Sequence, residues 1–317
     1  MTRTAFVFPG HGSQRVGMGK EQLARRPDLA DAYFRQAEDL LGIPLGRLCR
    51  EGPARDLDDP AVTQPAVFLT SLIALDVLRG QGIEPDAVAG HSLGEYAALV
   101  AAGVLEWTEA LWLVRLRGEL VATVGDRVRG ATAAVLGLGY ATVVRLCAEA
   151  AAETGQTVEA TGDNGPGQVV VSGRAEAVAA LTRAALRAGA SRVAPLDPGG
   201  PFHSSLLRSV RGEYAEALIR TDFREPRVPF VSSVTGTRLS TAAEIVVALS
   251  DQLTEPVRWT RTVTTLSGMG AERFVEVGPG LVLGGLIRRI APGARVHATG
   301  TARQLARTER AFAAATV

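Results

Sequence analysis

Residues 85–96 read PDAVAGHSLGEY, and this stretch decides the interpretation of the rest of the chain. A short apolar run ends at Gly90-His91-Ser92-Leu93-Gly94, and a helix-like segment, EYAALVAAG (residues 95–103), follows at once. In a strand, sharp turn and helix, the G-x-S-x-G pattern presents a serine hydroxyl above a helix N-terminus, and the glycines allow the tight turn and the close approach of strand and helix. The stretch therefore predicts an α/β fold with Ser92 as a candidate nucleophile, although five-residue matches of this kind also arise by chance.

Composition and charge narrow the class of protein. Among 317 residues, 34 are basic and 33 acidic, so the net charge of +1 creates no global field that would attract nucleic acid or an anionic membrane. Cys49 and Cys147 lie far apart without metal-binding spacing and are typical of buried thiols in a reducing compartment. The N-terminal stretch reaches glycines too early for a signal peptide, and no apolar run is expected to approach the length of a membrane span. We therefore expect a cytoplasmic protein without a membrane or nucleic-acid partner.

Units of strand, glycine-rich turn and helix recur along most of the chain. The first strand-like run, residues 5–8, stops at the turn PGHGSQ (residues 9–14). Later strand-like runs cover residues 228–236 and 273–280, and helical patterns cover residues 27–42, 63–82, 105–125, 206–219, 242–253 and 281–290. Such units predict a mostly parallel sheet covered on both faces. The Ala-rich C-terminal tail is expected to fray.

Residues 129–198 show a different order of strand-like and helical patterns. Strand-like runs at 130–138, 157–164, 167–173 and 191–197 alternate with helical patterns at 140–155 and 174–189. This β-α-β-β-α-β order is the ferredoxin-like arrangement, which folds as a unit of its own. We therefore predict a catalytic domain formed by residues 1–128 and 199–317, with a ferredoxin-like subdomain, residues 129–198, inserted into it.

A nucleophilic serine needs a base, and the chain contains four histidines. His91 neighbours Ser92 in sequence and should point away from the serine, and His297 is interpreted as a surface residue. His203 follows a Gly-Gly-Pro turn, at a loop position where parallel sheets place catalytic groups, and is favoured as the base. No acidic residue stands out as a third member, so a backbone carbonyl is an alternative partner that would fix the tautomer of His203.

An oxyanion hole requires two N–H groups aimed at one point. The backbone N–H of Leu93, directly after the candidate nucleophile, is one donor by the usual geometry of the turn. The turn at residues 9–12 follows the first strand and is the natural source of the second, so the backbone N–H of His11 is our candidate.

Eight motifs in order carry a resemblance to a known family. They are FPGHGSQRVGMG (8–19), TQPA (63–66), GHSLGEY (90–96), LVRLRGEL (113–120), GQVVVSG (167–173), PFHS (201–204), QLTEPVRW (252–259) and EVGPG (276–280). Together they closely resemble the malonyl-CoA:acyl carrier protein transacylase family, which includes transacylases of fatty-acid synthesis and acyltransferases of polyketide synthases. The resemblance implies an α/β-hydrolase-like large domain with an inserted ferredoxin-like subdomain.

The resemblance also implies a ping-pong reaction without a metal or other cofactor. Ser92 would attack a coenzyme A thioester with His203 as base, and the acyl group would pass to the phosphopantetheine thiol of an acyl carrier protein. Arg117 matches the family arginine that pairs with the free carboxylate of a malonyl group, a role that suits a bidentate guanidinium. Without the resemblance, Arg117 would be interpreted as a solvated helix arginine.

The remaining site residues are also implied by the resemblance. Gln64 matches a glutamine near the active site, the backbone carbonyl in the Gln252 segment would orient the histidine, and Phe202 is typical of malonyl-specific members. Three positions depart from the family. His11 replaces a glutamine, and Val121 and Thr132 replace methionines that often line the pocket, which suggests a larger acyl pocket unless neighbours refill the space.

The leading hypothesis is a standalone acyltransferase that loads a malonyl-type group from coenzyme A onto an acyl carrier protein for fatty-acid or polyketide biosynthesis. One alternative is transfer of a bulkier acyl group between carrier proteins, as the smaller residues 121 and 132 suggest. Another is a proofreading hydrolase that removes stalled acyl groups from carrier proteins, although the retained Arg117 argues against it. Carrier proteins are usually acidic, so surface arginines are expected to guide the partner. Candidates by sequence position are Arg208, Arg258, Arg261, Arg288 and Arg289.

Overall fold

Six strands form the larger sheet, in the order β10-β9-β1-β2-β7-β8. The computed structural model describes residues 2–196 and 201–314. The strands are β1 (Arg3–Phe8), β2 (Ala87–Gly90), β7 (Phe230–Val231), β8 (Arg238–Leu239), β9 (Ala271–Glu276) and β10 (Arg295–Ala298). Neighbouring strands are parallel except β7 and β8. The predicted α/β fold with a mostly parallel sheet is confirmed.

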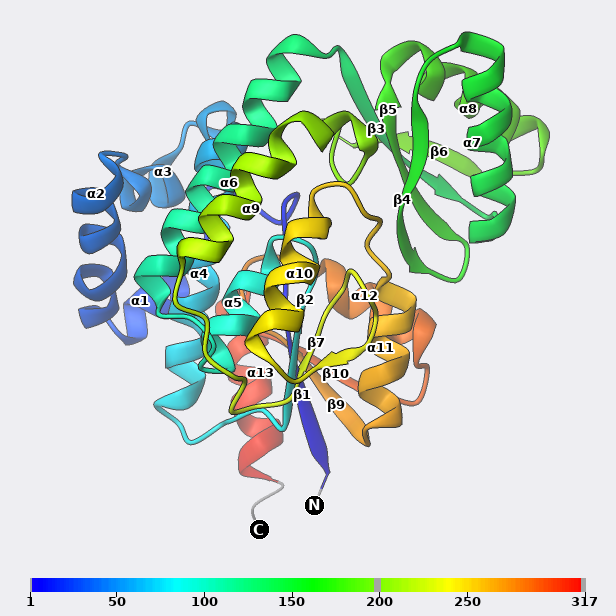
Figure 1. Ribbon diagram of the computed structural model, residues 1–317. Helices are drawn as coiled ribbons and strands as arrows, with labels where there is room; N and C mark the ends of the chain where they lie inside the picture. Colours follow the sequence, from blue (N-terminus) through cyan, green and yellow to red (C-terminus); the bar gives the residue numbers. More distant parts are fainter. Residues whose placement is uncertain (1, 197–200, 315–317) are drawn as a thin grey trace.

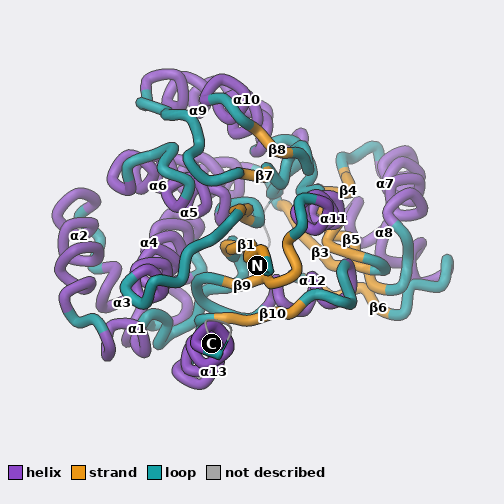
Figure 2. The backbone as a smooth tube through the Cα atoms, turned by 90° about the horizontal axis from the view of Figure 1, so that it is seen from below, coloured by secondary structure: helices purple, strands orange, loops and turns teal. Residues whose placement is uncertain are grey.

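Both faces of this sheet are covered, because successive side chains of a strand point to opposite sides. On β1, Phe6 and Phe8 belong to the larger core, and Ala5 and Val7 belong to a second core behind the sheet. The larger core is built with α4 (Pro60–Arg79), α5 (Gly94–Ala101), α6 (Trp107–Arg127), α9 (Arg208–Arg220) and α10 (Ala242–Gln252). The second core is built with α11 (Trp259–Gly268) and α12 (Val282–Ile290), and Figure 2 shows the strands lying between these helix layers.

Helix α4 is the central helix of the larger core. Asp59 caps its N-terminus by accepting a hydrogen bond from the N–H of Ala61 (2.8 Å), and Pro60 occupies the first helical position. Its length and mean hydropathy of 1.6 would suit a membrane span, so the expectation that no run reaches that length was wrong. However, 89% of the apolar window is buried inside the protein, as in a core helix.

Short helices pack beside α4 at the end of the molecule that lies away from the smaller sheet (Figure 1). They are α1 (Lys20–Arg25), the π-helical η1 (Ala30–Arg35), α2 (Gln36–Leu41), α3 (Leu45–Glu51) and the 3-10 helix η2 (Ala54–Leu57). The single helix predicted over residues 27–42 is thus a π-helical turn that continues into α2.

The smaller sheet has four antiparallel strands in the order β4-β5-β3-β6. Its chain order is β3 (Gly130–Leu136), α7 (Tyr140–Thr154), β4 (Val158–Gly165), β5 (Gln168–Arg174), α8 (Ala175–Arg187) and β6 (Arg192–Pro195). The two helices cover one face around a separate core that includes Val135, Leu146 and Val171. The predicted order of strands and helices is present. Residues 198 and 199, where the predicted insertion ends, lie outside the described residues.

Several elements differ from the sequence-based expectation. The strand predicted over residues 228–236 is only β7, because the chain turns back where the N–H of Gly236 bonds the carbonyl of Ser232 (2.9 Å). Residues 302–313 form α13 (Ala302–Ala313) and bury Leu305 completely, so the expected frayed tail is wrong over this range. His297 lies in β10, half-buried against the ring of Phe312, rather than on an irregular surface segment.

Candidate active site

The turn that follows β2 is built around two glycines that tolerate no side chain. A Cβ on Gly90 would lie 2.0 Å from the carbonyl carbon of Gly94, and a Cβ on Gly94 would lie 2.1 Å from the carbonyl oxygen of Phe8. These contacts bring the end of β1, the end of β2 and the start of α5 together. The turn consequently projects Ser92 at the carboxyl edge of the sheet, where open α/β sheets place their ligand sites.

Ser92 and His203 share an unusual backbone conformation. Their φ angles are 55° and 56°, and among the described residues they are the only non-glycine residues with positive φ. The left-handed region costs an L-residue roughly 1–2 kcal/mol. Strain of this kind persists where the surrounding structure imposes it, and it gathers at functional sites.

The side chains of Ser92 and His203 form a hydrogen-bonded dyad. Ser92 Oγ lies 2.6 Å from His203 Nε2, and His203 Nδ1 lies 2.7 Å from the backbone carbonyl oxygen of Gln252 and 3.1 Å from that of Glu255. These acceptors place the ring proton on Nδ1 and leave the lone pair of Nε2 facing the serine hydroxyl. Burial, followed by the charge of Arg117, lowers the pKa of His203 to about 3, so the ring is a neutral base at physiological pH.

His91 does not join this dyad. Its Nε2 lies 2.9 Å from Asn164 Oδ1 on β4, and its ring packs edge-on against Trp259 with centroids 5.2 Å apart. Burial lowers the pKa of His91, which keeps this ring neutral as well. The residue therefore ties the turn of Ser92 to the smaller sheet.

Arg117 is a buried cation with neutral partners. Its side chain is 1% exposed, and it donates to Gln64 Oε1 (Nη1, 2.7 Å), Gln252 Oε1 (Nε, 3.1 Å) and Ser92 Oγ (Nη2, 3.2 Å). Helix α6 can bring it here because Gly118 packs against the start of α4, where a Cβ would lie 2.5 Å from the carbonyl oxygen of Pro60. A buried charge normally needs an ionic partner, so this guanidinium is suited to receive an anion.

The Gln252 side chain joins the groups around the nucleophile. Its Nε2 donates to the backbone carbonyl of Ser92 (3.2 Å) and to the carboxylate of Glu95, while its Oε1 accepts from Arg117. The Glu95 carboxylate also accepts from the N–H of Ser233, and burial raises the pKa of Glu95 to about 7. The sequence-based prediction missed this role of Glu95, for which the one available signal was an acidic residue in the first turn of the otherwise apolar α5.

Two backbone N–H groups, in the turns that follow β1 and β2, are available to a ligand. In the part of the chain that the structure describes, no protein acceptor bonds the N–H of His11 or of Leu93. A Cβ on Gly10, the residue before His11, would lie 2.4 Å from the carbonyl oxygen of His91, so the two turns are in direct contact. The ring of His11 packs against Phe202, with centroids 4.8 Å apart.

The remaining predicted residues lie in different surroundings. Val121 is buried on α6, one turn after Arg117. Thr132 belongs to β3 of the smaller sheet, and its hydroxyl lies 3.1 Å from that of Ser172. Within the described ranges, no group of three or more His, Cys, Asp or Glu side chains is placed to hold a metal ion.

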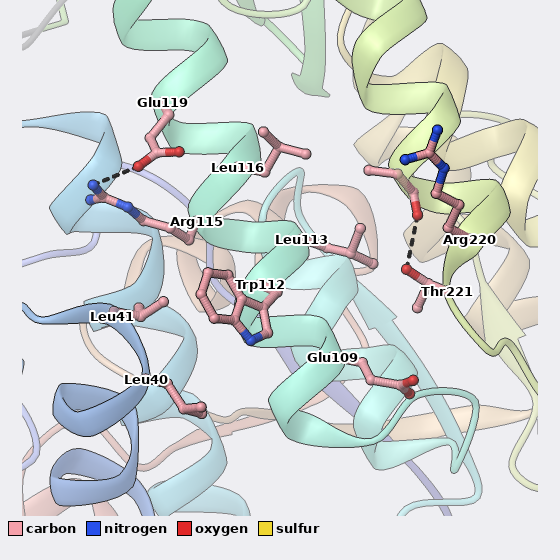
Figure 3. A pocket seen from close by; sticks show the side chains of 11 residues that line it. Leu40, Leu41, Glu109, Trp112, Leu113, Arg115, Leu116, Glu119, Arg220 and Thr221 are labelled. Carbon is pink, nitrogen blue, oxygen red and sulfur yellow. Dashed lines mark hydrogen bonds and ion pairs between the residues drawn. The ribbon is translucent and has the colours of Figure 1, made fainter.

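A groove of about 500 Å³ lies elsewhere, on the outer side of α6. Figure 3 shows Trp112, Leu113 and Leu116 along it, with the ion pair of Arg115 and Glu119 at one end. None of the predicted site residues lines this groove. It is therefore a separate surface feature.

Sequence comparisons agree with this arrangement. Residues 5–289 match the family model described as acyl transferase domain. The malonyl CoA-acyl carrier protein transacylase of Escherichia coli (strain K12) is 41% identical over 291 residues, covering 92% of this chain and 93% of that protein. The enzyme of the same name from Bacillus subtilis (strain 168) is 39% identical over 290 residues, covering 92% and 91%.

Solved structures give a matching result. The malonyl-CoA:acyl carrier protein transacylase of Xanthomonas oryzae pv. oryzae superimposes with a TM-score of 0.93 at 37% identity, covering 98% of each chain. A malonyl-transacylase solved in complex with its type II polyketide synthase acyl-carrier protein also gives 0.93 at 37% identity, covering 98% of this chain and 99% of that one.

Proposed function

The chain belongs to the acyl transferase family, and we propose that it moves a malonyl-type acyl group from coenzyme A to the phosphopantetheine thiol of an acyl carrier protein. The observation that carries this proposal is the buried Arg117, whose hydrogen-bond acceptors are neutral and whose Nη2 lies 3.2 Å from Ser92 Oγ. A carboxylate one carbon away from the reacting carbonyl would reach this guanidinium while the carbonyl lies beside the nucleophile.

In the first half-reaction, Ser92 Oγ attacks the thioester carbonyl carbon while His203 Nε2 takes the hydroxyl proton. The backbone N–H groups of His11 and Leu93 stabilise the oxyanion that forms. The carbon–sulfur bond then breaks, and the leaving coenzyme A thiolate takes the proton from His203. The product of this step is a malonyl ester on Ser92.

In the second half-reaction, the thiol of the carrier protein replaces coenzyme A. His203 Nε2 takes the thiol proton, the sulfur attacks the ester carbonyl, and Ser92 Oγ leaves with that proton. The carbonyl oxygens of Gln252 and Glu255 hold the ring proton on Nδ1 through both steps and stabilise the imidazolium that forms in each.

The identity of the acyl group follows from electrostatics. A neutral acyl group would leave the Arg117 charge buried without a counter-ion, whereas a carboxylate would accept two parallel hydrogen bonds from it. This argument favours a malonyl-type group over a bulkier neutral group. It also favours transfer over hydrolysis of neutral stalled acyl groups.

We also propose a domain organisation and a cellular localisation for this protein. Residues 1–128 and 199–317 form an α/β-hydrolase-like catalytic domain, and residues 129–198 form a ferredoxin-like subdomain; the strand order β4-β5-β3-β6 with two helices on one face supports the second name. The reaction needs no metal or other cofactor, because serine and histidine supply the nucleophile and the base. Acyl-coenzyme A and carrier protein are the substrates, which suits a cytoplasmic enzyme.

Intact-protein mass spectrometry after brief incubation with malonyl-coenzyme A tests the proposal. The wild-type protein should gain one malonyl group, lose it on addition of a phosphopantetheine-bearing acyl carrier protein, and leave that carrier malonylated. Ser92→Ala should gain nothing. A wild-type protein that stays unmodified, or a malonyl group retained on Ser92→Ala, contradicts the proposed function.

A further inference from the structure

The ring nitrogens of His11 are buried beside the site without a hydrogen bond. Both ring nitrogens are shielded from solvent, and neither has a partner among the described residues. A neutral imidazole carries one N–H donor and one acceptor, so burial leaves both unsatisfied in the free protein. Unsatisfied buried polar groups are rare in folded proteins, and each calls for an explanation such as strain, a catalytic role or a bound water or ion.

The location of the ring identifies which ligand it would meet. His11 follows Gly10, which touches the turn of Ser92, and its ring packs against Phe202, the neighbour of His203. Burial, followed by the charge of Arg117, lowers the pKa of His11 to about 4, so the ring is neutral at physiological pH. The imidazole thus packs beside the neighbour of the base, on a turn that touches the turn of the nucleophile, and within the range of the Arg117 charge.

The side-chain amide of Gln64 is a second buried donor without a partner. Gln64 uses its Oε1 to accept from Arg117, and its buried Nε2 has no partner within the described part of the chain. A carboxylate has two oxygens with about four acceptor sites, of which a bidentate guanidinium fills two. The carboxylate of a bound acyl group would therefore still have acceptor sites for other donors near Arg117.

We propose that the His11 side chain is a specificity residue, whose ring N–H donates a hydrogen bond to the carboxylate that Arg117 binds. This inference rests on the proposed function, since it concerns the acyl group carried by Ser92. The backbone N–H of the same residue serves the carbonyl end of that group. His11 consequently contacts both ends of a malonyl group, while a group without a carboxylate leaves its ring unsatisfied.

The rate of loading of Ser92 with malonyl-coenzyme A and with acetyl-coenzyme A tests this. His11→Leu keeps the backbone N–H and removes both ring nitrogens. It should lower kcat/KM for malonyl loading by about 10- to 100-fold and that for acetyl loading by less than about threefold, as expected for one lost bond to a charged group. His11→Gln, which retains an N–H donor, should recover most of the malonyl activity. His297→Leu, a substitution in β10 of the main sheet, is the matched control and should not change the ratio of the two rates.

A measurement on the wild-type protein does not depend on the folding of any variant. The 15N signals of the His11 ring should shift when Ser92 is malonylated and stay near their free values when Ser92 is acetylated. Equal losses of both loading rates in His11→Leu would show that the ring acts by packing, and unchanged rates would show that it makes no bond to the acyl group. Either result overturns the proposal while leaving malonylation of wild-type Ser92 intact, whereas failure of that malonylation contradicts the proposed function itself.

Discussion

The guanidinium of Arg117 donates a hydrogen bond to the hydroxyl of Ser92, with Nη2 3.2 Å from Oγ. The same oxygen lies 2.6 Å from His203 Nε2, so it accepts from the cation and donates to the base. A positive charge beside the hydroxyl favours its deprotonation. Under the proposed function, recognition of an anionic acyl group and activation of the nucleophile would both depend on this buried side chain.

Replacing Arg117 should separate malonyl from acetyl loading. In Arg117→Ala, kcat/KM for loading of malonyl-coenzyme A should fall by at least about 100-fold, because a bidentate charged pair is lost. Acetyl loading should fall much less, since that group has no carboxylate. Arg115→Ala is the control: Arg115 lies on the same helix but pairs with Glu119 at 2.6 Å, and its loss should leave the ratio of the two rates unchanged. A parallel fall of both rates in Arg117→Ala would show that the arginine supports the nucleophile without selecting the acyl group.

The activity should not depend on a histidine that titrates near its ordinary pKa. Because the pKa of His203 is about 3, this histidine should add no inflection between about pH 6 and 8 to kcat/KM for malonyl loading, which reports the free enzyme; the group of the site that titrates there is Glu95, with a pKa of about 7. A rate profile with an inflection near pH 6.5 that persists in Glu95→Gln would contradict the assignment of a buried, neutral base.

The stability of the fold should fall at a lower pH, below about 6.5. His11 and His203 have lowered pKa values of about 4 and about 3, so below their ordinary value of 6.5 the unfolded chain binds more protons than the folded one. Their contribution is present above pH 6.5 and is lost as the pH falls. Glu95 acts in the opposite direction: its pKa is raised from 4.5 to about 7, so its contribution is lost as the pH rises through that window. Burial also lowers the pKa of His91 and His297 and raises that of Glu276, so four histidines oppose two carboxyls. Thermal unfolding at successive pH values should therefore show Tm falling between about pH 6.5 and 4 in the wild type, and more steeply once Glu95→Gln removes one opposing group.

Features of the site formed by residues close together in the sequence could be predicted. Contacts between residues far apart in the sequence could not. The turn of Ser92 could be predicted because its glycines and its apolar flanks lie within a dozen residues. Arg117 looks like a solvated helix residue by spacing, and it is buried only because Gly118 lets α6 pack closely on α4. The contacts of Gln252 with Glu95 and with the backbone of Ser92 join residues 157 and 160 positions apart, which no local pattern can reveal.

The same distinction applies to the fold. The strands β1 and β2 were predicted because both are buried on two faces and therefore read as apolar runs. β10 lies at the edge of the sheet and reads Arg-Val-His-Ala, so its composition carries no strand signal. α13 was missed because the Ala-rich composition of the tail suggested fraying, although Leu305, Thr308 and Phe312 follow helical spacing on the face that packs against the protein.

The side chain of Gln252 should support both stability and selectivity. Gln252→Leu keeps the backbone carbonyl that holds His203, but it removes the acceptor for Arg117 and the donor for Glu95. Losing these buried hydrogen bonds, two of which involve charged groups, should cost about 2–4 kcal/mol in the free energy of unfolding, measured with urea, and should reduce malonyl loading more than acetyl loading. Gln304→Leu on α13, where the buried Oε1 is already unpaired, is the control and should cost little. If Gln252→Leu is as stable as wild type, the network around Glu95 is not a source of stability.

The strained backbone of Ser92 predicts a difference between two inactive variants. Ser92→Ala and Ser92→Gly both remove the hydroxyl and the acceptor for Arg117, so neither should form an acyl-enzyme. At φ 55°, however, alanine keeps the Cβ that makes the left-handed region costly, whereas glycine does not. After allowance for the greater flexibility of glycine in the unfolded chain, Ser92→Gly should be the more stable by about 1 kcal/mol in urea unfolding. Ser71, in the middle of α4, supplies the matched pair: there the helical backbone makes glycine the worse replacement, so the order of the two variants should reverse. Equal stability of the two Ser92 variants would mean that the backbone of the turn is not strained. The positive φ of Ser92 would then follow from the glycines on either side and would carry no energetic cost.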